Sequence, residues 1–239
     1  MNIYKNVSLL KADARESLLG NLGVSVPSVL LYMISVISLA CMISTFQTTN
    51  PFFSLALTSL SFLVINIVSG LLEIGLDMEF LRFQYGKKAR VGDLFTAFRF
   101  NSNTCVETQS VLGLMNLACM MPALIYSCFF TESSTARYIF TFGILLGLGL
   151  CGVFFLHLVF ALVPYLLLDF PQLTWKQVLR VGVKMMQGHK ARLFRLYLSF
   201  IPLISLGMLS LGFANMWIDS YIHAAAAAFY KDRIANTRA

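Results

Sequence analysis

The sequence predicts an all-α polytopic membrane protein: six transmembrane helices in three hairpins, each preceded by a cytoplasmic amphipathic interfacial helix. Hydrophobic residues make up 58% of the 239 residues and charged residues 12%, whereas soluble proteins have about 45–50% and about 25%. The mean hydropathy is +0.75. The apolar residues gather in runs of the length that crosses a bilayer, about 20 residues. We expect a single membrane domain over residues 1–239.

Six apolar runs are separated by polar or basic segments. The runs predicted to span the membrane are Val24–Phe46, Phe52–Leu76, Val106–Phe130, Tyr138–Leu168, Leu196–Leu211 and Met216–Tyr230. The fourth is long enough to tilt or to protrude. The sixth is short and carries Asp219 and His223, so it fits a spanning helix least well.

The basic residues predict the orientation. With the N-terminus inside and six crossings, only Arg137 of the 18 Lys and Arg residues lies on the outer side. Cytoplasmic loops carry such an excess of positive charge, so we expect both termini in the cytoplasm. The same bias explains the net charge of +7, and we expect no nucleic-acid partner.

Three inner segments show apolar residues at helical spacing, beginning near Ile3, Val91 and Thr174. The third follows a capping-box spacing, Thr174-x-x-Gln177. This organisation predicts three units, residues 1–80, 81–170 and 171–239. Basic amphipathic helices favour anionic lipid of the inner leaflet, and alternatively they pack on the bundle as connectors. The residues expected at the lipid interface are Lys5, Lys11, Arg15, Trp175, Lys176, Arg180 and Lys184.

The C-terminal third carries a recognisable set of residues. It contains Pro164-Tyr165-x-x-x-Asp169-x-Pro171, then Met185-Met186-x-Gly188-x-Lys190, and further on Trp217, Tyr221 and Ala228-Phe229-Tyr230. With these residues the chain resembles the bacterial integral membrane family catalogued as domain of unknown function 975. Pro202-Leu203 and Ser220-Tyr221 depart from the pattern of that family, which indicates a divergent member. The resemblance implies a multi-pass protein of the bacterial cytoplasmic membrane, and it implies no activity or site residues.

Ionisable residues at membrane depth are the candidate binding residues, because a central Asp, Lys or Arg costs about 2.5–3.5 kcal/mol there. Glu73 and Asp77 lie one helical turn apart at the inner end of the second run. They could bind a cation or relay protons, or they could form a solvated helix end paired with Arg82 or another inner base. His157, inside the fourth run, could line a pathway or make an interhelical hydrogen bond.

Two further sites lie in the C-terminal third. Asp169 precedes Phe170-Pro171 and is expected to cap a helix or to pair with a base. Asp219 and His223 share one face of the sixth run. A metal site there would need further ligands, and the sequence provides none.

The function predicted first is a non-enzymatic membrane module for partner binding, assembly or an envelope role. No catalytic or phosphate-binding motif is present, and the five cysteines lack metal-ligand spacing. We therefore expect no enzyme activity, no cofactor and no metal. The alternative is a transporter or lipid-handling permease that uses the buried ionisable residues. The expected partners are anionic lipids and an unidentified membrane protein.

Overall fold

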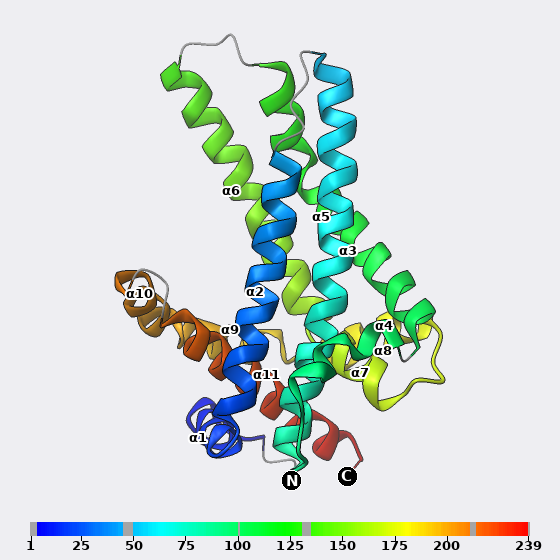
Figure 1. Ribbon diagram of the computed structural model, residues 1–239, viewed down its shortest axis with the longest axis vertical. Coiled ribbons are helices and arrows are strands. Elements are labelled where there is room, and N and C mark those ends of the chain that lie inside the picture. Colours follow the sequence, from blue (N-terminus) through cyan, green and yellow to red (C-terminus); the bar gives the residue numbers. More distant parts are fainter. Residues whose placement is uncertain (1–3, 45–49, 100, 131–134, 211–213, 239) are drawn as a thin grey trace.

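A computed structural model describes residues 4–44, 50–99, 101–130, 135–210 and 214–238. Within these ranges the protein is helical and contains no strand (Figure 1). The elements are α1 (Val7–Leu18), α2 (Leu22–Ser44), α3 (Pro51–Gln84), the 3-10 helix η1 (Val91–Phe95), α4 (Thr96–Arg99), α5 (Ser102–Phe129), α6 (Thr135–Phe160), α7 (Val163–Asp169), α8 (Trp175–Met186), α9 (Lys190–Leu198), α10 (Ile201–Leu209) and α11 (Asn215–Arg238).

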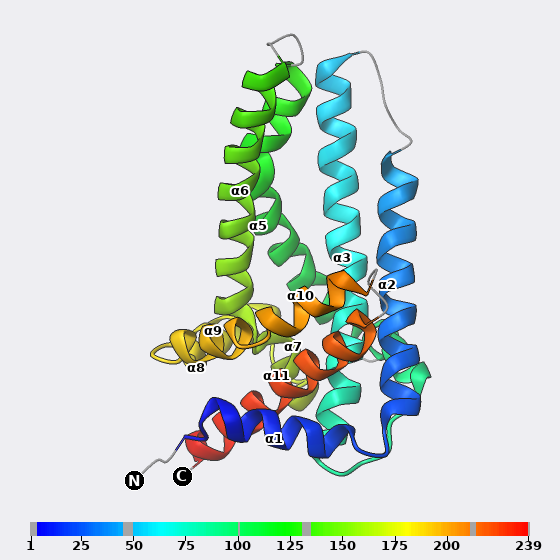
Figure 2. The same ribbon diagram turned by 90° about the vertical axis from the view of Figure 1, so that its left-hand side faces the viewer.

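Four long helices, α2, α3, α5 and α6, run along the long axis of the molecule (Figures 1 and 2). Large apolar side chains are exposed on their outer faces, including Phe52, Phe140 and Leu148. Helices that are apolar on all sides suit a lipid environment. This arrangement is consistent with a membrane protein, as the composition predicts.

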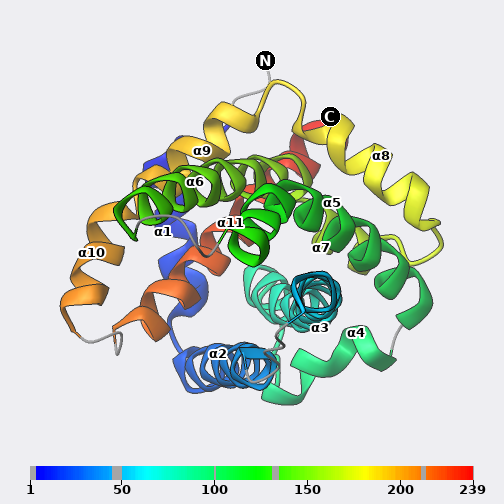
Figure 3. The same ribbon diagram turned by 90° about the horizontal axis from the view of Figure 1, so that it is seen from above.

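Seen from above, α3 lies between α2 and α5 (Figure 3). Amide side chains join α3 to α5, because Gln109 donates to the carbonyl of Gly70 at 3.1 Å and Asn116 donates to Asn66 at 3.1 Å. Gly113 of α5 faces Leu63 and Asn66 of α3. Small residues and interhelical hydrogen bonds hold helices together where lipid removes the hydrophobic drive.

Helix α3 continues past the apolar run that predicts it. It ends at Gln84 rather than near Leu76, because α1 and α11 bury its last turns. The Gln84 amide donates to Ser17 of α1 at 3.0 Å and to the carbonyl of Ala224 of α11 at 3.2 Å. Asp77, Glu79 and Arg82, which follow Leu76, are therefore helical.

The prediction of six spans is not confirmed. Among the described residues, five segments are long and apolar enough to cross a membrane: Leu22–Cys41, Pro51–Gln84, Ser102–Phe129, Ala136–Asp169 and Lys190–Leu209. The fifth is divided between α9 and α10, with Pro202 in the first turn of α10. The predicted sixth span forms α11, which meets α10 part-way along the long helices (Figure 2).

Helix α11 is covered by protein rather than by lipid. Ala224, Ala225, Ala227 and Ala228 are buried, and the helix packs on α1, α2 and α3. Small side chains allow this close approach. Beyond Tyr230 the helix carries charge, which explains why its hydropathy stays below that of a span.

Of the three segments predicted as amphipathic helices, two form the helices α1 and α8, and the third forms the short elements η1 and α4. α1 buries Leu10, Ala14 and Leu18 and packs on α11, whereas α8 packs on α5, α6 and α7. The predicted capping box is confirmed, since the Gln177 carboxamide accepts from the Thr174 backbone N–H at 3.0 Å.

The segment after Val91 is not one continuous helix. It forms η1 and the single turn α4. The Asp93 carboxylate accepts from the backbone N–H of Arg90 at 2.9 Å and pairs with Arg82 at 2.5 Å. These contacts hold the tighter turn in place beside α3.

The two ends of the described chain lie together. The backbone N–H of Lys5 donates to Asp232 at 3.4 Å, and Asp232 also pairs with Arg192 of α9 at 2.5 Å. The Arg233 guanidinium donates to the Tyr4 hydroxyl at 3.0 Å. The start of the described chain, α9 and α11 are thereby joined at one end of the molecule.

Candidate functional site

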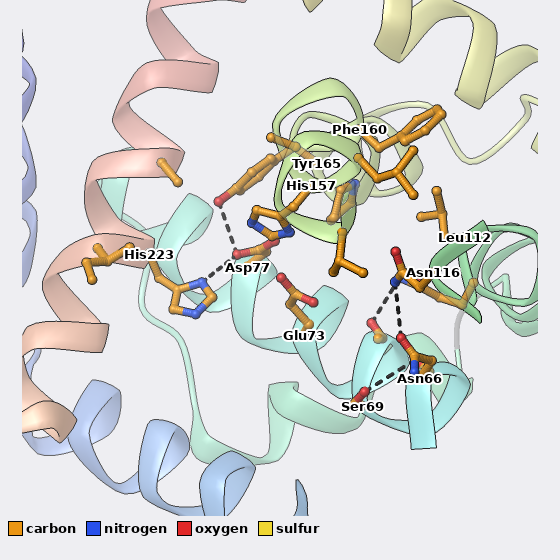
Figure 4. Close-up of a pocket in the computed structure, with 18 of the residues that line it drawn as sticks. Asn66, Ser69, Glu73, Asp77, Leu112, Asn116, His157, Phe160, Tyr165 and His223 are labelled. Carbon is orange, nitrogen blue, oxygen red and sulfur yellow. Dashed lines mark hydrogen bonds and ion pairs between the residues drawn. The ribbon is translucent and has the colours of Figure 1, made fainter. Parts of the chain in front are cut away.

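A cavity of about 340 Å³ lies among α3, α5, α6 and α11 (Figure 4). One face of α3 forms its most polar wall. Asn66, Ser69, Gly70, Glu73 and Asp77 recur there at spacings of three and four residues, so their side chains project from the same side of the helix. The helical periodicity of α3 therefore produces the polar wall of the cavity.

Asp77 is paired within this wall. Its Oδ1 atom lies 2.9 Å from Nδ1 of His223 and accepts a hydrogen bond from the Tyr165 hydroxyl at 3.1 Å. The His223 ring stacks on Phe80, with centroids 5.6 Å apart. α11 thus places an imidazole against a buried carboxylate, and partners of this kind offset the cost of burying a charge.

His223 lies on α11, outside the five apolar segments. Burial alone would lower its pKa, but the hydrogen bond and charge of Asp77, together with the charges of Glu73 and Asp219, raise the pKa overall. The raised pKa favours the imidazolium form. The pair is then Asp77 carboxylate with protonated His223, which has no net charge.

Glu73 lies one turn before Asp77 and lines the same cavity. Figure 4 shows its carboxyl directed toward Asp77 and His157. Across the part of the chain that the structure describes, no residue forms a hydrogen bond or ion pair with this carboxyl. Glu73 is therefore a cavity carboxyl with hydrogen-bonding capacity to spare.

His157 reaches the cavity from α6. Its ring lies 6.1 Å from that of Tyr197 of α9, measured between centroids. Four of the six candidate binding residues thus meet in one place: Glu73, Asp77, His157 and His223. The expected pairing of Asp77 with Arg82 is wrong, because Arg82 pairs with Asp93.

Asp169 and Asp219 do not line this cavity. Asp169 accepts from the Tyr230 hydroxyl at 2.7 Å, and the Tyr230 ring stacks on Tyr165 with centroids 4.9 Å apart. Burial raises the pKa of Asp219, and the charge of His223 only partly opposes this. Asp169 forms a structural hydrogen bond beside the site. Asp219 lies outside the cavity, and its charge helps to raise the pKa of His223.

The family model described as "Protein of unknown function (DUF975)" matches residues 1–237. The chain belongs to this family. Comparison with curated proteins and with solved structures finds no match. The family description assigns no activity to its members.

Sequence reasoning missed several cavity residues of the DUF975 protein. Buried Tyr165 of α7 and half-buried Tyr197 of α9 line the cavity, and Gln109 and Asn116 face it from α5. Asn66 and Ser69, which precede Glu73 at helical spacing, were the signal in the sequence for a longer polar face on α3. No local pattern marks the tyrosines, because only packing brings them to Asp77.

Glu79 was also missed. Its side chain is fully buried, and neither carboxyl oxygen has a hydrogen-bond partner within the described ranges. Ser28 of α2 and the backbone of Leu94 lie beside it. Glu79 is not among the cavity residues, so this carboxyl is a separate, uncompensated polar group inside the protein.

The residues predicted at the lipid interface separate into two groups. In α1, Lys11 donates to the Ser199 carbonyl at 2.9 Å and Arg15 donates to the Tyr221 hydroxyl at 3.0 Å. Burial and the charge of Arg15 lower the pKa of Lys11. Lys5 pairs with Asp13 at 2.6 Å. These α1 bases are engaged within the protein.

The α8 group is different. Lys176, Arg180 and Lys184 are exposed, and Lys176 lies 5.1 Å from the ring centroid of half-buried Trp175. The α8 bases therefore remain available to contact an external anion.

Proposed function

We propose that this DUF975 protein is a proton-linked membrane permease that holds its cargo in the cavity beside Glu73. One observation carries the proposal: Glu73 faces a cavity among membrane-length helices, and the described residues leave its carboxyl unpaired. An intramembrane ionisable group is expensive and usually marks an ion or substrate pathway. Neighbouring Asp77 differs, because His223 and Tyr165 already use its oxygens.

A proton relay fits the arrangement of groups. Glu73, His157 and the Asp77–His223 pair line one cavity, and chains of carboxyl and imidazole groups are typical of proton relays in pumps and transporters. In this proposal Glu73 loses its proton when the cargo binds, and protons also pass along the relay when the cavity holds no cargo. The protein performs no covalent conversion and needs neither cofactor nor metal.

The proposed location is the bacterial cytoplasmic membrane, with both termini in the cytoplasm. The grouping of α1, α9 and the end of α11 supports this orientation, as does the basic character of these elements. The contacts of Asp232 with Lys5 and Arg192 join the end of α11 to the start of the described chain. They support a shared side for the two ends whether or not Lys190–Leu209 crosses the membrane.

The other function predicted from the sequence is a partner-binding or assembly module. Such a module has no need for an unpaired carboxyl in a cavity, which is why the permease is favoured. The module makes a distinct prediction, an unidentified membrane protein that co-purifies at a fixed ratio. Anionic lipids of the inner leaflet are proposed as partners under either function, through the exposed bases of α8.

The permease is tested by proton flux into liposomes. The purified protein is reconstituted with a pH-sensitive dye in the lumen, and a potassium diffusion potential drives protons inward. We expect the wild type to acidify the lumen faster than protein-free liposomes, and Glu73→Gln to return the rate to that background.

Glu107→Gln is the matched control, because Glu107 is exposed on α5 and does not line the cavity. It should retain the wild-type rate. A wild-type rate equal to that of protein-free liposomes would overturn the proposal, as would full activity in a well-folded Glu73→Gln protein.

A further inference from the structure

A second hollow lies next to the cavity. It is a groove of about 450 Å³ formed by α6, α9, α10 and α11. Phe154, Phe194, Leu198, Ile201 and Ile204 line it. Apart from His157 and Tyr197 this lining is hydrocarbon, so the groove suits an aliphatic chain better than a charged group.

The groove and the cavity adjoin, because His157, Tyr197 and Ile222 line both of them. The cavity side of this shared wall is polar and holds Glu73 and the amides of Gln109 and Asn116. The groove side is apolar. A ligand that occupies both hollows must therefore be polar at one end and apolar at the other.

The charge at the polar end selects the head group. Asp77 and protonated His223 balance one another at 2.9 Å, whereas Glu73 has no ion-pair partner within the described ranges. With His157 neutral, an ionised Glu73 therefore leaves one negative charge in the cavity. Carboxylates accept strong, charge-assisted hydrogen bonds from ammonium groups, and an anionic head would meet an uncompensated like charge.

We propose that the cargo is an amphiphilic amine, with its protonated amine at Glu73 and its hydrocarbon tail in the groove between α6 and α10. This inference rests on the proposed permease function and specifies its substrate class. Release follows when Glu73 takes up a proton and loses its attraction for the ammonium group. The apolar tail accounts for the apolar groove that adjoins the polar cavity.

The test measures binding of dodecylamine, butylamine and dodecanol in phosphatidylcholine nanodiscs. Native mass spectrometry counts the bound molecules as the mole fraction of each probe in the bilayer is raised. We expect dodecylamine to bind at least about tenfold more tightly than either of the other probes, because it alone has both a charged head and a long tail.

Two substitutions separate the head from the tail. Glu73→Gln should weaken dodecylamine about tenfold and leave dodecanol unchanged. Ile204→Trp fills the groove and should weaken dodecylamine and dodecanol together, without affecting butylamine. Ile139→Trp is the matched control, since Ile139 is exposed on α6 and does not line the groove. If Glu73→Gln fails to fold, Ile204→Trp still tests the tail.

The outcomes distinguish the two proposals. Equal binding of dodecylamine and butylamine would overturn the proposal that the cargo is an amphiphilic amine. Glu73-dependent proton flux would still support the permease function. Dodecylamine binding that is unchanged in both Glu73→Gln and Ile204→Trp would also overturn the amphiphile. Loss of both the flux and the Glu73-dependent amine binding would remove both proposals.

Discussion

Nδ1 of His223 and Oδ1 of Asp77 lie 2.9 Å apart although the residues are 146 positions apart in the chain. Asp77 belongs to a long apolar helix, and His223 belongs to a helix buried by protein. Their contact closes one side of the cavity and fixes α11 against α3. It therefore controls both the stability of the fold and the electrostatics around Glu73.

Removing one member of this pair should cost more than removing both. His223→Ala leaves the Asp77 carboxylate buried with only Tyr165 as a partner, and breaking a buried pair costs about 3–5 kcal/mol. The double variant Asp77→Asn, His223→Ala should recover part of that loss. Thermal unfolding in detergent measures both. His189→Ala is the control, because His189 lies outside the cavity. Equal losses in the single and double variants would contradict the ion pair.

The stability of the protein should depend on pH through His223. Its pKa is raised in the folded state above the ordinary value of 6.5, so its protonated form stabilises the fold. This contribution is fully present below pH 6.5 and is lost as pH rises through the folded pKa. We expect the Tm of wild type, relative to His223→Gln, to fall on going from pH 6 to pH 9. Both proteins retain Glu73, Asp77, Tyr165 and Asp219, so the contribution of these four residues largely cancels in the difference in Tm. A constant difference would show that folding does not raise the pKa of His223.

Glu79 should be replaceable with a gain in stability. Its oxygens are fully buried without hydrogen-bond partners, and burying an uncompensated polar group costs about 1–3 kcal/mol on mutational scales. Glu79→Leu should therefore raise the Tm in detergent. Glu107→Leu, at an exposed position of α5, should change it little. A lower Tm in Glu79→Leu would indicate that this carboxyl has a stabilising partner.

Gly75 should tolerate no larger residue. A Cβ atom at this position would overlap the backbone of Leu94 in η1, and backbone cannot move aside as a side chain can. Gly75→Ala should destabilise the protein by about 1–3 kcal/mol. Gly143 has nothing within 4 Å of a Cβ position, so Gly143→Ala should be neutral or slightly stabilising. Chemical unfolding of the two variants in detergent decides this, and equal stabilities would place η1 away from α3.

The exposed bases of α8 should bind anionic lipid. Each basic residue near a membrane surface contributes about 1 kcal/mol to this attraction. The double variant Arg180→Gln, Lys184→Gln should therefore retain less phosphatidylglycerol in native mass spectrometry. Lys11→Gln should retain as much as wild type, because Lys11 is engaged by the Ser199 carbonyl. Unchanged retention in the α8 variant would assign α8 a purely structural role.

The sequence by itself determined the class of protein, its family and the four long helices, because hydropathy and helical periodicity are local properties. The i, i+4 spacing of Glu73 and Asp77 already placed both carboxyls on one face of α3. The capping box at Thr174 was equally visible, since its two residues are neighbours along the chain.

Only the tertiary structure decided what those carboxyls meet. Asp77 is paired with His223 rather than Arg82 because α11 packs against α3 and because η1 holds Arg82 beside Asp93. The fate of the sixth apolar run was settled in the same way, since protein rather than lipid surrounds the alanines of α11. Such contacts join residues far apart in the chain, and no local pattern specifies which helices pack together.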